Sequence, residues 1–367
     1  MDKKLKIAII GSRGYPYIYS GYETLVKEIS ERIVKKGHHV RIYCHSSLFK
    51  KKPKNINGIE LVYTPSIRSK IFSQLYNSFF SFLHVCFSKI DIVLVVNSAN
   101  GPFGIFTKIF RKKTCINVDG LEWLRPKWRG LGSLYFKISS KLSTFLFDVV
   151  ITDSKEMSKI YKINFNKDSE LIAYGSTMSK ISSKQILDFY NLKKNNYYLI
   201  VGRLIPDNNS EIIIRGFINS NSRKKLVVVG DVPYTDKYSN KIKNIKSEQI
   251  ILTGYIKNQE NLSQLYNNCF GYIHGHEFGG TNPTMINALS LNCQILALNT
   301  VFNHEMLSKK EAIFFEKSIN SISKSIDLFE KSIKQLIFSN QDYKLPLCYD
   351  WEKITENYLD LFLKLKK

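Results

Sequence analysis

The sequence predicts an α/β protein with two doubly wound parallel sheets. Short runs rich in β-branched residues alternate with helical stretches, which is the pattern of parallel strands covered by helices. The runs come in two sets, and the polar stretch 176–196 separates them. The expected strands are residues 5–10, 40–44, 90–96, 114–118 and 149–152 in the first set, and 197–201, 226–229, 250–252, 271–274 and 295–298 in the second.

The length of the chain fits two domains, because 367 residues are enough for two cores of ordinary size. We expect one Rossmann-like domain over residues 1–175 and a second over residues 190–349, facing each other across a central cleft. Apolar residues recur at helical spacing from Trp351 to Phe362, so we expect a helix at the end of the chain.

The net charge of +23 is unevenly distributed along the chain. Residues 1–150 hold 25 Lys and Arg against 9 Asp and Glu, a net charge of +16, whereas the rest of the chain holds 29 against 22, or +7. A basic half favours an anionic partner, either a nucleic acid or an anionic membrane. The alternative is a general abundance of lysine, as in the solvated run 50–54.

Cysteine spacing and hydropathy favour a cytoplasmic location. None of the six cysteines has a partner at metal-ligand or redox spacing, so we expect reduced thiols. The charged start leads directly into the first strand without an apolar signal segment. The most hydrophobic stretch, 71–90, contains Gln74, Asn77 and His84 and is too polar to span a bilayer.

The first loop excludes a dinucleotide-binding protein. This loop follows the first expected strand and reads Gly11-Ser-Arg-Gly-Tyr-Pro16. The dinucleotide fingerprint needs glycines where Arg13 and Pro16 stand, and the spacing of a phosphate-loop ATPase is also absent.

Two interpretations are open for the helix after this loop. Ser20 and Glu23 have the spacing of a capping box, which is a purely structural role. Alternatively, Gly14 and Gly21 let a diphosphate approach the helix N-terminus, with Arg13 nearby.

The second half of the chain carries a further candidate anion site. Arg203 lies just past the expected strand 197–201, where it can bind a diphosphate with two parallel hydrogen bonds; the alternative is a surface arginine. Gly279 and Gly280 allow close backbone approach, and Asn282 is a good N-cap for a helix that starts at Pro283. The free N–H groups of that helix would face an anion.

The sequence does not predict a metal site. His274 and His276 have no third ligand at plausible spacing, so structural roles are expected for both. The chain also contains no D-x-D pair, which argues against a metal-diphosphate mechanism.

Several strings distributed over the whole chain are distinctive when taken together. They are Ile10-Gly-Ser-Arg-Gly-Tyr-Pro16, Tyr19-Ser-Gly-Tyr-Glu-Thr24, Asn117-Val-Asp-Gly-Leu-Glu-Trp123, Thr152-Asp-Ser154, Val201-Gly-Arg203, Gly275-His-Glu-Phe-Gly-Gly-Thr-Asn-Pro283 and Tyr349-Asp-Trp-Glu-Lys-Ile354. In this order they resemble the bacterial rhamnosyltransferases of glycosyltransferase family four. The strings starting at Asn117 and at Gly279 are the specific ones.

The resemblance implies a GT-B fold and a metal-independent, retaining transfer of L-rhamnose from dTDP-L-rhamnose, with no cofactor. The acceptor would be a lipid-linked saccharide, so the protein would lie peripherally on the inner face of the plasma membrane. The first domain would bind the acceptor and the second the nucleotide-sugar. The helix in residues 350–367 would pack back on the first domain.

The resemblance and the strand positions together assign the site residues. Asp119 and Arg203 are the candidate catalytic residues, Asp119 orienting or deprotonating the acceptor hydroxyl and Arg203 stabilising the leaving diphosphate. The alternative for Asp119 is an N-cap, with Glu122 three residues on. The donor side comprises Arg13, Gly14, Gly21, Gly279, Gly280, Thr281, Asn282 and Asn287. The acceptor side comprises Tyr22, Glu23, Glu122 and Trp123.

A surface for the acceptor and the membrane is expected next to Asp119. Trp123 and Trp128 alternate there with basic residues, although an ordinary loop fits equally well. The basic residues are Arg125, Lys127 and Arg129.

Two departures from the family pattern concern the donor. Ser20 stands where the family usually has glycine, and Asn287 stands where it usually has a glutamate that holds the nucleotide-sugar. The rival enzymes are a GT-B transferase that uses a UDP- or GDP-sugar and a sugar-nucleotide epimerase. The non-enzyme alternative is a basic nucleic-acid-binding protein, but no reader motif is present, so we expect no nucleic-acid partner.

Overall fold

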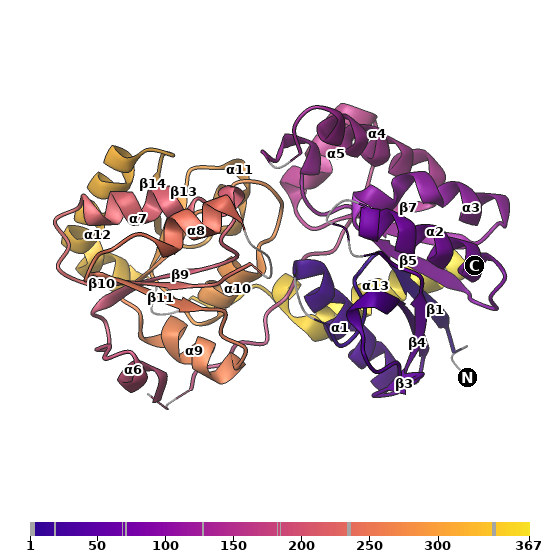
Figure 1. Ribbon diagram of the computed structural model, residues 1–367, viewed down its shortest axis with the longest axis horizontal. Coiled ribbons are helices and arrows are strands. Elements are labelled where there is room, and N and C mark those ends of the chain that lie inside the picture. Colours follow the sequence, from indigo (N-terminus) through magenta and orange to yellow (C-terminus); the bar gives the residue numbers. More distant parts are fainter. Residues whose placement is uncertain are drawn as a thin grey trace. The chain divides into compact units, whose positions relative to one another are not determined.

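The chain folds into two compact units, one comprising Met1–Gly175 with Leu347–Lys367 and the other Ser176–Pro346 (Figure 1). The structure is a computed structural model, and it describes residues 4–17, 20–67, 69, 72–126, 128–181, 183, 185–232, 236–339 and 343–367. Each unit is a parallel sheet covered by helices, so the predicted α/β class with two Rossmann-like domains is confirmed.

The sheet of the first unit has the strand order β3-β4-β2-β1-β5-β6-β7-β8. All neighbours pair in parallel except β3 and β4, which are antiparallel. The strands are β1 (Lys6–Ile10), β2 (His39–His45), β3 (Asn55–Ile56), β4 (Ile59–Thr64), β5 (Ile92–Val96), β6 (Lys113–Asn117), β7 (Val149–Thr152) and β8 (Glu170–Leu171).

Two groups of helices cover this sheet. Helix α13 packs against α1, β5 and β6, while α3 packs against both α2 and α4. The Asn117 side chain at the end of β6 donates to the Tyr358 hydroxyl of α13 at 3.1 Å, which fixes α13 on the first unit. The helices are α1 (Gly21–Lys35), α2 (Phe72–Cys86), α3 (Gly104–Ile109), α4 (Leu131–Leu146), α5 (Lys155–Phe165) and α13 (Trp351–Lys366), with a 3-10 turn, η2 (Ser98–Phe103), before α3.

The sheet of the second unit is parallel throughout, with the order β11-β10-β9-β12-β13-β14. Its strands are β9 (Tyr197–Val201), β10 (Lys225–Val229), β11 (Ile250–Gly254), β12 (Gly271–His274), β13 (Ile295–Leu298) and β14 (Ala312–Phe315). Its helices are α6 (Gln185–Phe189), α7 (Ser210–Ile218), α8 (Lys237–Lys243), α9 (Gln259–Asn268), α10 (Pro283–Ser290), α11 (Val301–Met306) and α12 (Ile319–Ser339).

Every strand expected from the sequence is present, and four further strands were missed. Strands β3 and β8 have two residues each, while β4 and β14 are short and lie near a sheet edge, where side chains are only partly buried. The second unit starts at Ser176 rather than at residue 190. The stretch expected to be a polar linker contains α6, whose buried Ile186 N–H donates to Gln264 in α9. No helix in the described residues is long and apolar enough to cross a membrane.

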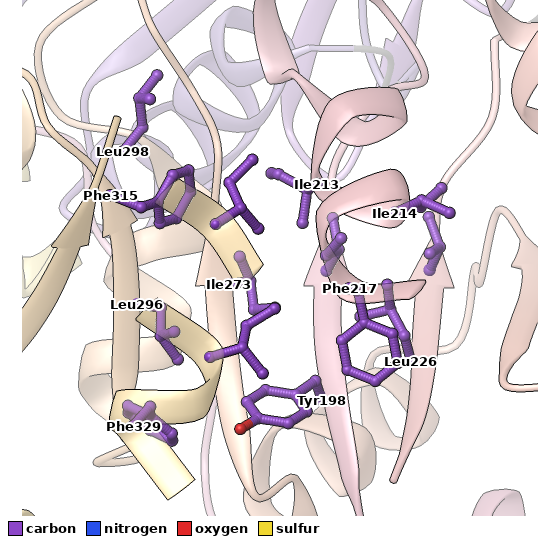
Figure 2. Packing of buried hydrophobic residues seen from close by; sticks show 14 of the residues in the cluster. Tyr198, Ile213, Ile214, Phe217, Leu226, Ile273, Leu296, Leu298, Phe315 and Phe329 are labelled. Carbon is purple, nitrogen blue, oxygen red and sulfur yellow. The ribbon is translucent and has the colours of Figure 1, made fainter. Parts of the chain in front are cut away.

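Helices α7 and α12 pack closely over the second sheet (Figure 2). Tyr198, Phe217 and Phe329 are buried there. The ring centroid of Tyr198 lies 5.5 Å from that of Phe217 and 5.9 Å from that of Phe329. Gly216 lies at the helix contact, where a Cβ would stand 2.5 Å from the Ile322 side chain. The glycine therefore sets how closely α7 and α12 approach.

We predict that Gly216→Ala lowers the free energy of unfolding by about 1–3 kcal/mol, the usual cost of overpacking a core. Calorimetric melting of the full chain measures the change. Gly132→Ala in α4 is the control, because its Cβ would meet only Trp128 at an ordinary 3.4 Å. Equal effects of the two substitutions would show that the contact between α7 and α12 is not tight.

Candidate active site

The carboxylate of Glu23 organises the first loop of the first unit. Its two oxygens accept from the backbone N–H of Arg13 at 3.0 Å and of Ser20 at 2.9 Å. The Ser20 hydroxyl also donates to Glu23, so the capping box expected from the sequence is formed. A negative charge thus already occupies the N-terminus of α1, and Glu23 positions the loop rather than facing an acceptor.

The glycines of this loop serve chain packing. Gly14 has φ +118°, and a Cβ there would stand 2.8 Å from the Cys44 side chain on β2. A side chain at this position would therefore collide with β2. Gly21 is the first residue of α1.

Asp119 lies at the carboxyl end of β6 and joins a buried polar group. Tyr174 and Asp153 are neighbours of its carboxyl, and both of these side chains are almost completely buried, while Asp119 is partly buried. The Tyr22 hydroxyl donates to the Asp119 backbone oxygen at 2.6 Å. The N-cap interpretation of Asp119 is wrong, because the following 3-10 turn starts after Leu121 and has no side-chain cap.

Burial raises the pKa of the Asp119 carboxyl, while the nearby Arg125 guanidinium opposes that shift. The Asp153 carboxyl is the neighbouring acid of Asp119, and we call these two residues the acid pair. Burial also raises the pKa of the Tyr22 hydroxyl, with Asp119 as the next cause, so this hydroxyl stays a donor.

The residues after Asp119 form a closed cluster instead of the expected surface. The Glu122 carboxylate pairs with Arg125 Nε at 2.9 Å and accepts from Trp128 Nε1 at 2.7 Å. Arg125 is only 8% exposed, so its assignment to an exposed acceptor and membrane surface is wrong. A Cβ on Gly120 would meet Arg125 at 2.9 Å, and its absence lets the arginine fold inward.

The other members of that expected surface are divided. Trp123 is partly buried and packs edge-on against Tyr161 and Phe165, with ring centroids 6.2 and 5.9 Å apart. Arg129 is exposed. Lys127 lies outside the described residues.

In the second unit, two loops at the carboxyl edge of the sheet are bonded to each other. Arg203 follows β9, and its backbone oxygen accepts from Asn208 at 2.8 Å. Asn208 also bonds His276 at 2.9 Å, while Asn209 donates to the Gly275 oxygen at 2.9 Å. The loop that carries Arg203 is therefore fixed against the loop after β12.

Glu277 belongs to this network, and the sequence analysis missed it. Its carboxylate accepts from Lys317 at 2.5 Å and from Asn209 at 3.3 Å. Its backbone N–H donates to the Asp207 oxygen at 3.1 Å. Glu277 lies inside the segment identified as informative, but no spacing rule singles it out, since its partners come from two other loops.

The start of α10 agrees with the sequence. Asn282 is the N-cap and accepts from Thr284 N at 3.0 Å, and Pro283 is the first helical residue. Gly279 has φ +122°, which favours glycine, and Gly280 and Thr281 beside it are buried. These residues form the turn into the helix N-terminus.

Asn287 lies one turn into α10 and is partly buried. Its side-chain oxygen accepts from the Ser176 hydroxyl at 2.7 Å. The Asn287 amide thus has a partner within the protein, the Ser176 hydroxyl. This is the position at which the resemblance to rhamnosyltransferases leads one to expect glutamate.

The histidines of this segment have structural partners. Burial lowers the pKa of His274 to about 3, so the ring is neutral, and it bonds the Tyr272 hydroxyl at 3.1 Å. Among the residues that the structure describes, no group of three His, Cys, Asp or Glu could hold a metal ion.

The Asp119 carboxyl gives a prediction for stability. Because its folded pKa is raised, ionisation costs stability as pH rises from the unfolded value of about 3.9 through the folded value. Asn cannot ionise, so Asp119→Asn should gain stability relative to the natural protein on going from pH 3.5 to pH 7, by on the order of 1 kcal/mol. Urea unfolding of both proteins across this range measures the difference. A difference that does not vary with pH would contradict the raised pKa.

Two family models match the chain, each over less than half of its length. Residues 183–343 match the family described as glycosyl transferases group 1, and residues 4–177 match the domain of unknown function DUF1972. Comparison with the curated proteins gives no significant match.

Solved structures share the fold over nearly the whole chain at low sequence identity. Sucrose-phosphate synthase from Thermosynechococcus elongatus matches with a TM-score of 0.83 at 14% identity, covering 99% of each chain. Anabaena HepE in complex with UDP matches with a TM-score of 0.75 at 14% identity, covering 98% of this chain and 100% of that chain. A glycosyltransferase from Rickettsia africae matches with a TM-score of 0.73 at 14% identity, covering 100% of both.

The fold of the chain is therefore the one seen in GT-B glycosyltransferase structures, and its second unit is similar to the glycosyl transferases group 1 family.

Proposed function

We propose that this protein transfers L-rhamnose from dTDP-L-rhamnose to a lipid-linked saccharide in cell-surface polysaccharide synthesis, with retention and without a metal. The donor and acceptor rest on the resemblance to rhamnosyltransferases, carried by the strings that start at Asn117 and Gly279. The single structural observation that supports the chemistry is the buried acid pair of Asp119 and Asp153 at the carboxyl edge of a parallel sheet.

The second unit supplies the donor side of the proposal. Arg203 follows the central strand β9, and the turn Gly279–Asn282 leads into α10. A guanidinium and a helix N-terminus both stabilise negative charge as a diphosphate leaves, which is the task a metal performs in other transferases. Glu277 and Lys317 fix the neighbouring loop and thereby the position of this turn.

Asp119 supplies the acceptor side of the proposal. A carboxyl with a raised pKa is a better base toward a sugar hydroxyl than an ordinary exposed one. Tyr174 and Asp153 orient this carboxyl, and Tyr22 fixes the backbone of the same residue. Glu23 and Glu122 hold the surrounding loops, and Trp123 is the partly buried ring available to a sugar.

The donor is tested by binding. We expect dTDP-L-rhamnose to raise the melting temperature more than UDP-glucose or GDP-mannose at equal concentration, both with and without EDTA. A ligand at 100 times its dissociation constant stabilises by about 2.7 kcal/mol. A larger shift with UDP- or GDP-sugar would replace the proposed donor with the alternative transferase. A shift lost in EDTA and restored by Mg²⁺ would contradict the metal-independent role of Arg203.

The role of Asp119 is tested by turnover. Asp119→Asn should lower the rate per folded molecule by about 10²-fold or more, with donor binding unchanged, because Asn cannot accept the hydroxyl proton. Asp148→Asn is the control, since Asp148 accepts from Thr114 at the opposite end of β6. Undiminished turnover of Asp119→Asn would assign the acid pair a structural role.

A further inference from the structure

Helix α2 exposes a row of large apolar side chains and buries several polar ones. Its exposed face carries Phe72, Tyr76, Phe79 and Leu83, at spacings of three and four residues, and Phe87 follows directly after the helix with 73% of its surface exposed. Its buried face carries the polar residues Asn77, Ser78 and Ser81, followed by the apolar residues Phe82, Val85 and Cys86. A helix on the surface of a water-soluble protein shows the opposite arrangement.

Hydrogen bonds fix the inward side of α2. Asn77 donates to the Thr64 hydroxyl at 2.7 Å, and Ser78 donates to Asn100 at 2.6 Å. Ser81 donates to the Asn77 backbone oxygen at 2.8 Å and lies 2.9 Å from the Thr64 hydroxyl. Rotating the helix to bury its aromatic rings would break these bonds, so the aromatic face points outward by construction.

Helix α4 repeats the pattern. Ser139, Ser140 and Ser143 are fully buried, and Ser139 donates to the backbone oxygen of Ser98 in η2. A Cβ on Gly101 would stand 2.1 Å from the Ser139 backbone oxygen, so η2 packs directly on α4. The outward stripe of α4 consists of Leu131, Leu134, Ile138 and Phe145.

Helix α3 connects the two stripes. The Phe79 and Phe106 ring centroids are 5.7 Å apart, and those of Phe87 and Phe110 are 5.0 Å apart. Ile105 and Ile109 are also exposed. We call the exposed apolar side chains of α2, α3, α4 and their C-terminal flanks the outer helix face. Its helices are those labelled together in the upper part of the first unit in Figure 1.

Basic residues surround the outer helix face. Residues 61–118 contain one acidic residue, Asp91, which pairs with Lys366, and residues 123–147 contain none. A hollow beside Phe145 is lined by Lys108, Arg111, Lys112 and Lys113. Its one acid, Asp148, accepts from Thr114. Two copies of such a face would repel each other, whereas an anionic lipid surface complements it.

We propose that the outer helix face is a membrane-docking surface that inserts its aromatic and aliphatic side chains among anionic phospholipids, while the basic hollow binds lipid phosphate. The inference rests on the proposed function only in that a lipid-linked acceptor requires access to a membrane. It differs from simple electrostatic attachment, because insertion of apolar side chains contributes binding that salt does not screen.

Vesicle flotation of the full chain tests the docking surface. The protein should float with vesicles of phosphatidylcholine and phosphatidylglycerol at least about tenfold more than with phosphatidylcholine alone. Phe72→Ser with Phe87→Ser should abolish flotation even at low salt. Arg111→Glu with Lys113→Glu should abolish the preference for phosphatidylglycerol. The matched control is Phe189→Ser in α6, because Phe189 is 75% exposed but lies outside the outer helix face; this variant should float like the natural protein.

Insertion has its own readout. Phe87→Trp should show a blue-shifted emission on mixed vesicles, and brominated lipid should quench it. Unchanged emission, or equal flotation of the Phe72/Phe87 variant, overturns the proposal. The proposal is also overturned if sedimentation shows that the natural protein is a dimer and that the Phe72/Phe87 variant is a monomer. The outer helix face would then be a contact between two copies of the chain. Nucleotide-sugar binding without vesicles should be the same in all variants, so failure of the donor assignment is separable from failure of docking.

Discussion

The parallel arrangement of both sheets places the carboxyl ends of their strands at one edge of each sheet. Residues far apart in sequence are brought together there. Asp119 follows β6, Asp153 follows β7 and Tyr174 lies just beyond β8, and they meet in one buried group. The same constraint brings the loops after β9 and β12 together in the second unit.

Burying this polar group has a cost that the surrounding bonds only partly offset. The raised pKa of Asp119 reflects that cost directly, since burial disfavours the charged carboxylate. Glu122 and Arg125 are also buried, but each satisfies the other, with Trp128 completing the set. The first unit therefore contains an ion pair, Glu122 with Arg125, beside an acid pair in which burial raises the pKa of Asp119.

The sequence was sufficient for the fold and for residues whose role depends on chain position. Strand ends located Asp119 and Arg203, and local rules located the Asn282 cap. It was insufficient where partners come from distant elements, as for Asp153, Tyr174 and Glu277. Arg125 was wrongly assigned to an acceptor and membrane surface because it alternates with other basic residues and tryptophans, whereas its partner, Glu122, lies three residues away inside the fold.

The sequence analysis treated residues 71–90 only as a hydrophobic stretch too polar to span a bilayer, and it did not predict which side of α2 or α4 faces inward. In most helices apolar burial alone sets the orientation, but here directional bonds from Asn77, Ser78 and Ser139 act together with the buried Phe82 and Phe136. The outward residues of these helices are consequently released from the demands of core packing. Residues on the outward side can therefore be substituted to suit water or lipid without changing how the helices pack on the sheet. In this unit the orientation of a helix and the composition of its exposed side are set by different residues.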